Sequence, residues 1–132
     1  MRAFLKTQPK TEEDIKCSKD CMIRSVAIAT NTPYSEVHKI MYKNGWRATR
    51  NKSKGNWEDQ IIETLTELGF KYRKISYPAV KGQSRMTATT MVNEGTYILR
   101  MSKHVAAYKD GILMDTWDCS DSCVYFAWEV WK

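Results

Sequence analysis

Three residue types that together can carry nucleophilic catalysis lie along this 132-residue chain in the order Cys21, His104, Asp115. A thiolate is the nucleophile, an imidazole can take and return its proton, and a carboxylate can fix the tautomer of the imidazole. Asp20 is expected to cap a helix that begins at Cys21, and the free amides and dipole of that helix would lower the pKa of the thiol. The backbone amide of Cys21 would help to hold an oxyanion. The sequence therefore predicts a Cys-His-Asp triad.

The first half of the chain is expected to form three helices that position the cysteine. Residues 21–30 are apolar on nearly all sides, which is typical of a central, buried helix. A second helix, at 33–43, has one apolar stripe and Pro33 at its first position. The third, at 57–68, follows Asn56 as its cap.

In the second half of the chain, the spacing of apolar residues becomes that of β-strands. The predicted strands carry the histidine and the aspartate. The Asp110-Gly111 pair between two apolar runs predicts a tight hairpin, with His104 at its start and Asp115 at its end. The residues before position 16 are expected to be extended, and 87–93 to form a short helix. The expected strands are 70–76, 96–101, 104–108, 112–115 and 124–131.

About half of the chain carries a resemblance to a known family, through the segments KDCMIRSVAIATNTPYSEVHKIM and GTYILRMSKHVAAYKDGILMDTWD. These segments resemble the papain-like cysteine peptidase superfamily, in particular small single-domain proteins of phages and bacteria related to bacteriocin-processing peptidases. The resemblance implies one α+β domain over 1–132, in which N-terminal helices, including a central nucleophile helix, pack on a C-terminal antiparallel sheet. It implies Cys21 as nucleophile, His104 as base and Asp115 as orienting acid. It also implies a peptide or protein substrate, and a phage protein acting on a host component.

One feature departs from the family pattern. Many papain-like enzymes have a Gln several residues before the nucleophile as a second oxyanion donor, but no Gln lies between Gln8 and Cys21. Lys16, Ser18 or a backbone amide would have to replace it.

Aromatic and acidic residues near the triad are candidates for substrate contacts. Trp46 and Trp117 can line a groove, although large aromatic side chains are more often part of a core. Asp20, next to the nucleophile, completes this candidate set. Asp118 is the alternative to Asp115 as the orienting acid.

The four cysteines allow a competing interpretation. Cys17, Cys21, Cys119 and Cys123 form two pairs with three residues between the members, and such pairs can hold a structural zinc ion. Zinc ligation would remove Cys21 from catalysis.

Composition leaves a third interpretation, a binding protein that keeps the fold without catalysis. The net charge is +6, and the segments 39–56 and 68–93 contain Lys and Arg but no acidic residue. Such loops can contact nucleic acid or an acidic protein, but no nucleic-acid motif is present, so solvated loops are the favoured interpretation. The sequence contains no nucleotide-binding fingerprint that would indicate an organic cofactor. It also contains no apolar run of the length that a membrane span or a signal peptide requires. We therefore expect a cytoplasmic protein without a cofactor, and the oligomeric state stays open.

Overall fold

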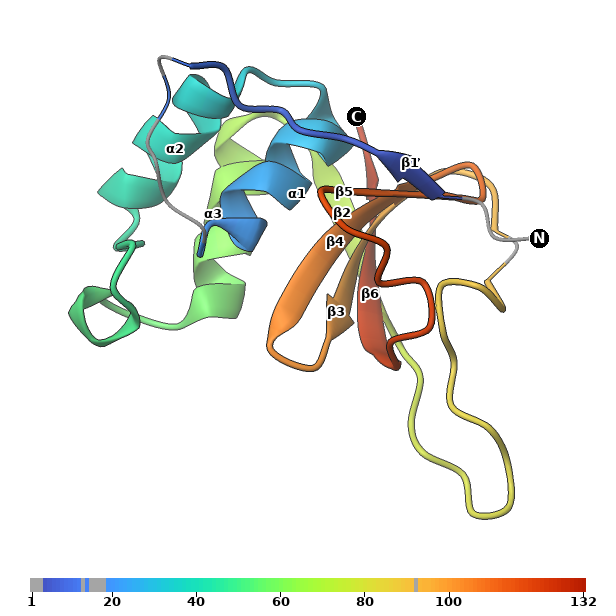
Figure 1. Cartoon of the computed structure of the whole chain (residues 1–132). Helices are drawn as coiled ribbons and strands as arrows, with labels where there is room; N and C mark the ends of the chain where they lie inside the picture. Colours follow the sequence, from blue (N-terminus) through green and yellow to red (C-terminus); the bar gives the residue numbers. More distant parts are fainter. Residues whose placement is uncertain (1–3, 13, 15–18, 92) are drawn as a thin grey trace.

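The computed structural model describes residues 4–12, 14, 19–91 and 93–132, and within them the chain is an α+β protein with three helices and a six-stranded mixed sheet (Figure 1). The helices are α1 (Cys21–Thr30), α2 (Tyr34–Lys43) and α3 (Trp57–Glu67), with a 3-10 turn at Arg50–Lys52. The strands are β1 (Phe4–Lys6), β2 (Lys71–Ser76), β3 (Thr96–Met101), β4 (His104–Lys109), β5 (Ile112–Asp115) and β6 (Val124–Trp131).

The three predicted helices are confirmed, but two of their predicted starts are wrong in detail. Asn56 caps α3 by accepting a hydrogen bond from the Glu58 amide at 2.7 Å. Asp20 precedes α1 as predicted, yet its side chain accepts no hydrogen bond from the helix amides, because it is turned toward buried cations instead. Pro33 stands one position before α2 rather than inside it.

The strand order is β1-β5-β4-β3-β6-β2, and every neighbouring pair is antiparallel except β1 with β5. The expected antiparallel sheet is therefore a mixed one. The predicted β4–β5 hairpin is confirmed, with φ of 49° at Asp110 and 86° at Gly111, the left-handed values that a tight hairpin turn requires.

Strand β1 is an element that the sequence did not predict, because a strand of three residues in a polar segment has no alternation to detect. It pairs in parallel with β5, where Leu5 faces Met114. The amide of Thr7 then donates to the carbonyl of Asp115 at 2.8 Å. The N-terminal segment is thus held beside the end of β5.

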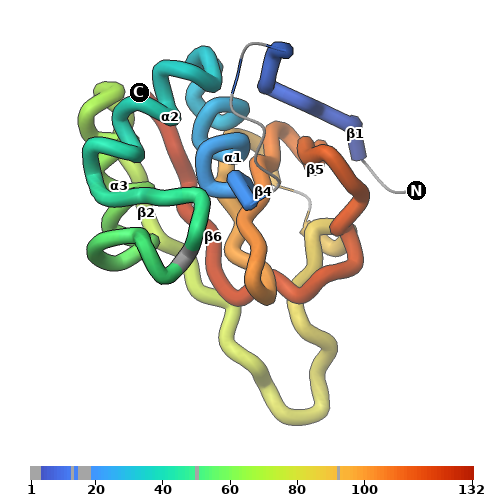
Figure 2. The backbone as a smooth tube through the Cα atoms, turned by 60° about the vertical axis from the view of Figure 1, so that its left-hand side comes forward, coloured from blue at the N-terminus to red at the C-terminus, as the bar shows by residue number. Residues whose placement is uncertain are grey.

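The short helix predicted at 87–93 is wrong for the described residues 87–91, which form a turn after an isolated bridge between Thr87 and Cys123. Threonine side chains add to the backbone bonds of this turn: Thr90 Oγ1 donates to the Thr87 carbonyl at 3.0 Å, and Thr89 Oγ1 to that of Ser120 at 3.1 Å. Residue 92 lies outside the described residues. Figures 1 and 2 show the connection between β2 and β3 extending away from the rest of the molecule.

Both faces of the sheet are covered. The helices pack on one face, where Ile23, Val26 and Trp128 belong to the larger apolar cluster (Figures 1 and 2). The second cluster, which includes Leu99 and Cys119, lies on the other face under the irregular segments. Among the described helices none is long and apolar enough to cross a membrane.

Candidate active site

The nucleophile candidate Cys21 is the first residue of α1, and this helix packs against β4, whose first residue is His104. The packing brings the Cys21 thiol close enough to the His104 side chain and the Val105 backbone for both to lower the pKa of the thiol. Two residues more than eighty positions apart in the sequence therefore meet at one end of the helix.

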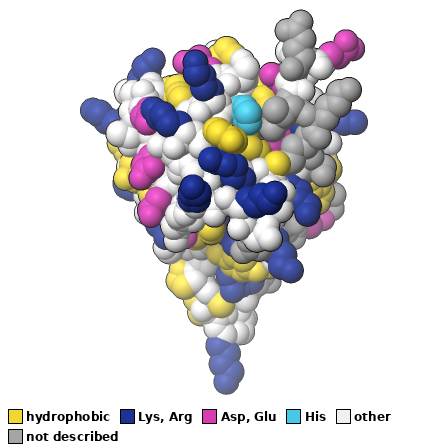
Figure 3. Space-filling model, turned by 90° about the vertical axis from the view of Figure 1, so that its left-hand side faces the viewer, with side chains coloured by type: hydrophobic (Ala, Val, Ile, Leu, Met, Phe, Trp, Pro, Cys, Tyr) yellow, Lys and Arg dark blue, Asp and Glu magenta, His cyan; other side chains and the backbone are white. Residues whose placement is uncertain are grey.

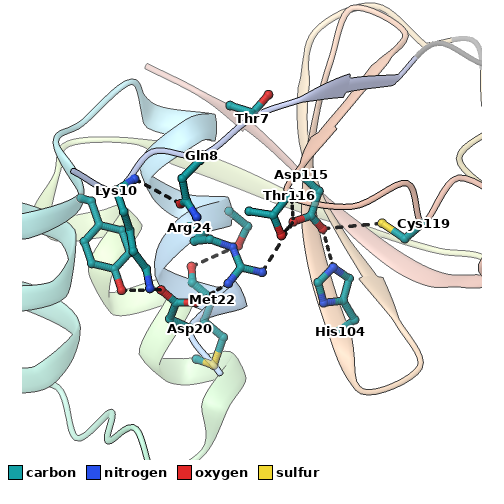
Figure 4. Close-up of polar contacts among 12 residues, drawn as sticks. Thr7, Gln8, Lys10, Asp20, Met22, Arg24, His104, Asp115, Thr116 and Cys119 are labelled. Atoms are coloured by element: carbon teal, nitrogen blue, oxygen red, sulfur yellow. Dashed lines mark hydrogen bonds and ion pairs between the residues drawn. The ribbon is translucent and has the colours of Figure 1, made fainter. Parts of the chain in front are cut away.

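Asp115 approaches the same imidazole from the neighbouring strand. The register that pairs Ala107 with Met114 sets Asp115 diagonally opposite His104, and the Asp115 Oδ2 atom lies 2.5 Å from His104 Nε2 (Figure 4). The other carboxylate oxygen, Oδ1, accepts from the Thr116 amide at 2.7 Å. It also lies 3.5 Å from the guanidinium of Arg24. Each oxygen of Asp115 thus has its own partner.

Cys21, His104 and Asp115 shift one another's pKa values. Burial alone would raise the pKa of Cys21, but the hydrogen bonds to His104 and Val105 and the charges of His104 and Arg24 lower it below the ordinary value of 9.0. Burial alone would lower the pKa of His104, but the hydrogen bonds to Asp115, Cys119 and Cys21 raise it to about 11. The pKa of Asp115 is lowered against its burial, mainly by His104. The arrangement favours a thiolate beside an imidazolium beside a carboxylate.

Comparisons with protein-family models, with curated proteins and with solved structures find no match to this chain. The papain-like relationship therefore stays a prediction, and the site has to be judged on its own residues.

A buried ion network behind the triad is the main feature that sequence reasoning missed. Arg24 is ion-paired with Asp20 on one side and reaches Asp115 on the other, so it joins the start of α1 to the end of β5 (Figure 4). Asp20 is fully buried and also pairs with Lys10 Nζ at 2.7 Å and with the Tyr34 hydroxyl at 2.6 Å. The spacing of four between Asp20 and Arg24 was the available signal, since such pairs meet on one helix face.

The N-terminal segment reaches the site as well, because Thr7 bonds to Asp115 and Lys10 pairs with Asp20. Gln8 lies between these two anchors, and its Oε1 accepts from the Lys10 amide at 3.2 Å. The proposed substitutes for an oxyanion glutamine, Lys16 and Ser18, lie outside the described residues.

In the part of the chain that the structure describes, the cysteines do not form the single cluster that the four-cysteine interpretation expects. Cys119 is 2% exposed and lies beside His104 and Asp115 rather than beside the other cysteines that the structure describes. Cys123 is a free thiol whose backbone bridges to Thr87. Cys17 lies outside the described residues. Cys21, Cys119 and Cys123 form no cluster able to share one metal ion among the residues described.

The substrate-contact candidates fall in different places. Trp117 is 50% exposed and its ring centroid lies 5.2 Å from that of His104, at the site. Trp46 is only 4% exposed and packs in the main core against His38, which offers a substrate little surface. Asp20 is buried in the ion network described above. Asp118 accepts hydrogen bonds from Ser120, whereas the carboxylate on His104 is that of Asp115.

The basic loops belong to the segments 39–56 and 68–93. Lys and Arg side chains gather on the side of the molecule that carries α2 and the loop after it (Figure 3). Some have internal partners: the Arg47 guanidinium lies 3.6 Å from the Tyr42 ring centre, and Lys43 pairs with Glu67 at 2.9 Å. Binding of nucleic acid by these loops stays a prediction.

Proposed function

We propose that the protein is a cysteine-dependent hydrolase or acyl transferase that acts on an amide bond of a peptide or protein. Cys21 is the nucleophile, His104 the acid and base, and Asp115 the group that orients His104. The observation that carries the proposal is the 2.5 Å contact of His104 Nε2 with Asp115 Oδ2 on two adjacent strands, beside a helix terminus where His104 lowers the pKa of the Cys21 thiol.

The chemistry follows from the ionisation of the three groups. The Cys21 thiolate attacks the carbonyl carbon and forms a tetrahedral oxyanion. The His104 imidazolium then gives its proton to the leaving nitrogen, which leaves a thioester on Cys21. Neutral His104 next removes a proton from water or from an acceptor amine, which attacks the thioester and takes the acyl group, so that the Cys21 thiolate and the His104 imidazolium are restored. Asp115 holds Nε2 of His104, so the other ring nitrogen serves Cys21.

The start of α1 suits the oxyanion. The Asp20 side chain accepts no hydrogen bond from the amides of the first helical turn. The amide of Cys21 and the positive end of the helix dipole therefore face the nucleophile without a side-chain cap. Trp117 beside His104 supplies an exposed apolar surface for the substrate chain.

A test uses an activated acyl donor that needs no knowledge of the natural substrate. With p-nitrophenyl acetate, we expect a burst of p-nitrophenolate and a thioester on Cys21, located by mass spectrometry of the intact protein and its peptides. Cys21→Ala should lose the burst, and Cys123→Ala, which changes a thiol outside the site, should keep it. Absence of acylation at Cys21 in the unmodified protein would contradict the proposal.

A further inference from the structure

Cys119 is a second thiol at the site that the proposed acyl chemistry does not use. It lies in the segment after β5, and its sulfur is 3.6 Å from Asp115 Oδ2, the oxygen that also holds His104 Nε2. One nitrogen, one oxygen and one sulfur from His104, Asp115 and Cys119 all lie within 4.8 Å of one another. Two of these three residues are almost fully buried, Asp115 at 3% and Cys119 at 2%.

We propose that His104, Asp115 and Cys119 form a binding site for one divalent transition-metal ion of the zinc class. Imidazole nitrogen, carboxylate oxygen and thiolate sulfur are the three ligand types that zinc takes in proteins. The combination disfavours Mg²⁺ and Ca²⁺, which bind oxygen ligands. Three protein ligands leave a fourth position open to water.

The surroundings of the three ligands fit this role. Asp115 Oδ1 is already held by the Thr116 amide and by Arg24, so Oδ2 is the oxygen directed at the ion. Cys119 is fixed by a turn in which the Ser122 amide donates to the Cys119 carbonyl at 3.0 Å. Ligands that are held by a second layer of hydrogen bonds bind metal more tightly than mobile ones.

Metal at this position would oppose acyl transfer, a consequence that rests on the proposed function. The ion separates Nε2 of His104 from Oδ2 of Asp115, and it displaces the proton between them together with the thiol proton of Cys119; both protons go to the solvent. His104 then cannot act as an acid toward a leaving group. The site is therefore an inhibitory metal site.

The binding test uses Co²⁺, which replaces Zn²⁺ and reports its ligands by absorption. Titration of the full chain should give one bound Co²⁺ with the visible bands of a tetrahedral ion and a sulfur-to-cobalt charge-transfer band with the intensity of one thiolate. Zn²⁺ should displace it. Cys119→Ser should remove the charge-transfer band and weaken binding at least about 100-fold, since loss of a direct ligand exceeds loss of an outer partner.

Cys21→Ser and Cys123→Ser are the matched controls, and both should keep the band. Absence of Co²⁺ binding to the unmodified protein, or a band that survives in Cys119→Ser, would overturn the proposal. A band of several thiolates that is lost in Cys123→Ser would also overturn it, in favour of the four-cysteine site. Because the unmodified protein alone reports the number of thiolates, the test holds even where a variant folds poorly.

The proposals of a metal site and of acyl chemistry are tested independently of each other. The absorption titration requires no activity, so it tests the metal site even if Cys21 is never acylated. If Co²⁺ binds through Cys119 and Zn²⁺ leaves acylation of Cys21 unchanged, the metal site stands and its inhibitory role is wrong.

Discussion

The two oxygens of Asp115 have separate partners, and this allows its role in chemistry to be separated from its role in folding. In Asp115→Asn, the amide oxygen can still accept from Thr116, but the amide nitrogen cannot accept from His104 Nε2. We expect the rate of Cys21 acylation to fall by up to about ten-thousand-fold, the loss seen when the same change fixes the wrong tautomer in a serine triad. Circular dichroism should show a retained fold. An unchanged acylation rate would show that Asp115 serves only the turn.

Arg24 is the cation that two buried carboxylates share. Its removal should therefore lower the free energy of unfolding more than removal of any surface charge. In Arg24→Met, Asp20 keeps Lys10 and Tyr34, but Asp115 loses its cation from α1. Breaking a buried pair on one side typically costs about 3–5 kcal/mol of unfolding free energy. Urea denaturation measures this loss, and Arg24→Lys, which keeps a positive charge, should lose less. Equal stability of Arg24→Met and the unmodified protein would mean that the network is not stabilising.

The sequence contained enough to bring Cys21, His104 and Asp115 together as candidates, since each stands at the end of an element whose pattern is clear. Among the partners of Asp20, only Arg24 was signalled by the sequence, through its spacing of four residues. A short acid before a helix usually caps it, but here a buried arginine four residues later and a lysine from the N-terminal segment compete for the carboxylate. The place of Cys119 was equally hidden, because it depends on how an irregular segment folds back onto β4.

The β4–β5 hairpin sets the distance between His104 and Asp115, and its turn needs a residue with positive φ at Gly111. An added Cβ there meets nothing within 4 Å, so Gly111→Ala has a conformational cost without a steric clash. We expect the free energy of unfolding to fall by about 1–2 kcal/mol, the cost of a left-handed conformation for a residue with a side chain. Asp110→Asn is the control, because Asn tolerates positive φ and can accept the Gly95 amide as Asp110 Oδ1 does. A destabilised control with an unaffected Gly111→Ala would contradict this view of the turn.

The regular elements were predictable where side chains alternate or recur at helical spacing. The β4–β5 turn was equally clear from Asp110-Gly111. Strand β1 was missed because its hydrogen bonds to β5, rather than its own composition, make it a strand. The helix predicted at 87–93 is wrong because its threonines bond to the backbone and to the segment around Ser120.

The pH dependence of stability follows from the proton balance of the Cys21–His104 pair in the protein as a whole. Folded, the pKa of Cys21 is lowered below 9.0 and that of His104 is raised to about 11, so between 9.0 and about 11 the pair holds one proton, on His104. Unfolded, it holds two protons below 6.5, one between 6.5 and 9.0, and none above 9.0. Above 9.0 the contribution of the pair to stability therefore falls toward about 11, while below 9.0 the lowered pKa of Cys21 offsets part of the fall that His104 causes.

Removal of the thiol should change this profile in one direction. In Cys21→Ala, only His104 remains, held by Asp115 and beside Cys119. Its contribution is complete below the unfolded pKa of 6.5 and is lost as pH rises toward the folded value. Urea denaturation across pH, with a chelator present, should thus show a steeper fall in stability between 6.5 and 9.0 than in the unmodified protein, where ionisation of Cys21 offsets part of that fall. Identical profiles for the two proteins would show that Cys21 and His104 do not share a proton.

The ionisation of Cys21 can be measured directly by the rate at which iodoacetamide alkylates each cysteine of the unmodified protein, mapped by mass spectrometry near pH 6 with a chelator present. An ordinary thiol is only about 0.1% ionised there, and the pKa of Cys119 is raised further by burial. The thiolate–imidazolium pair predicts that Cys21 reacts much faster than Cys119 and Cys123, and that His104→Ala removes this advantage. A rate at Cys21 no greater than that at Cys123 in the unmodified protein would contradict the proposed nucleophile.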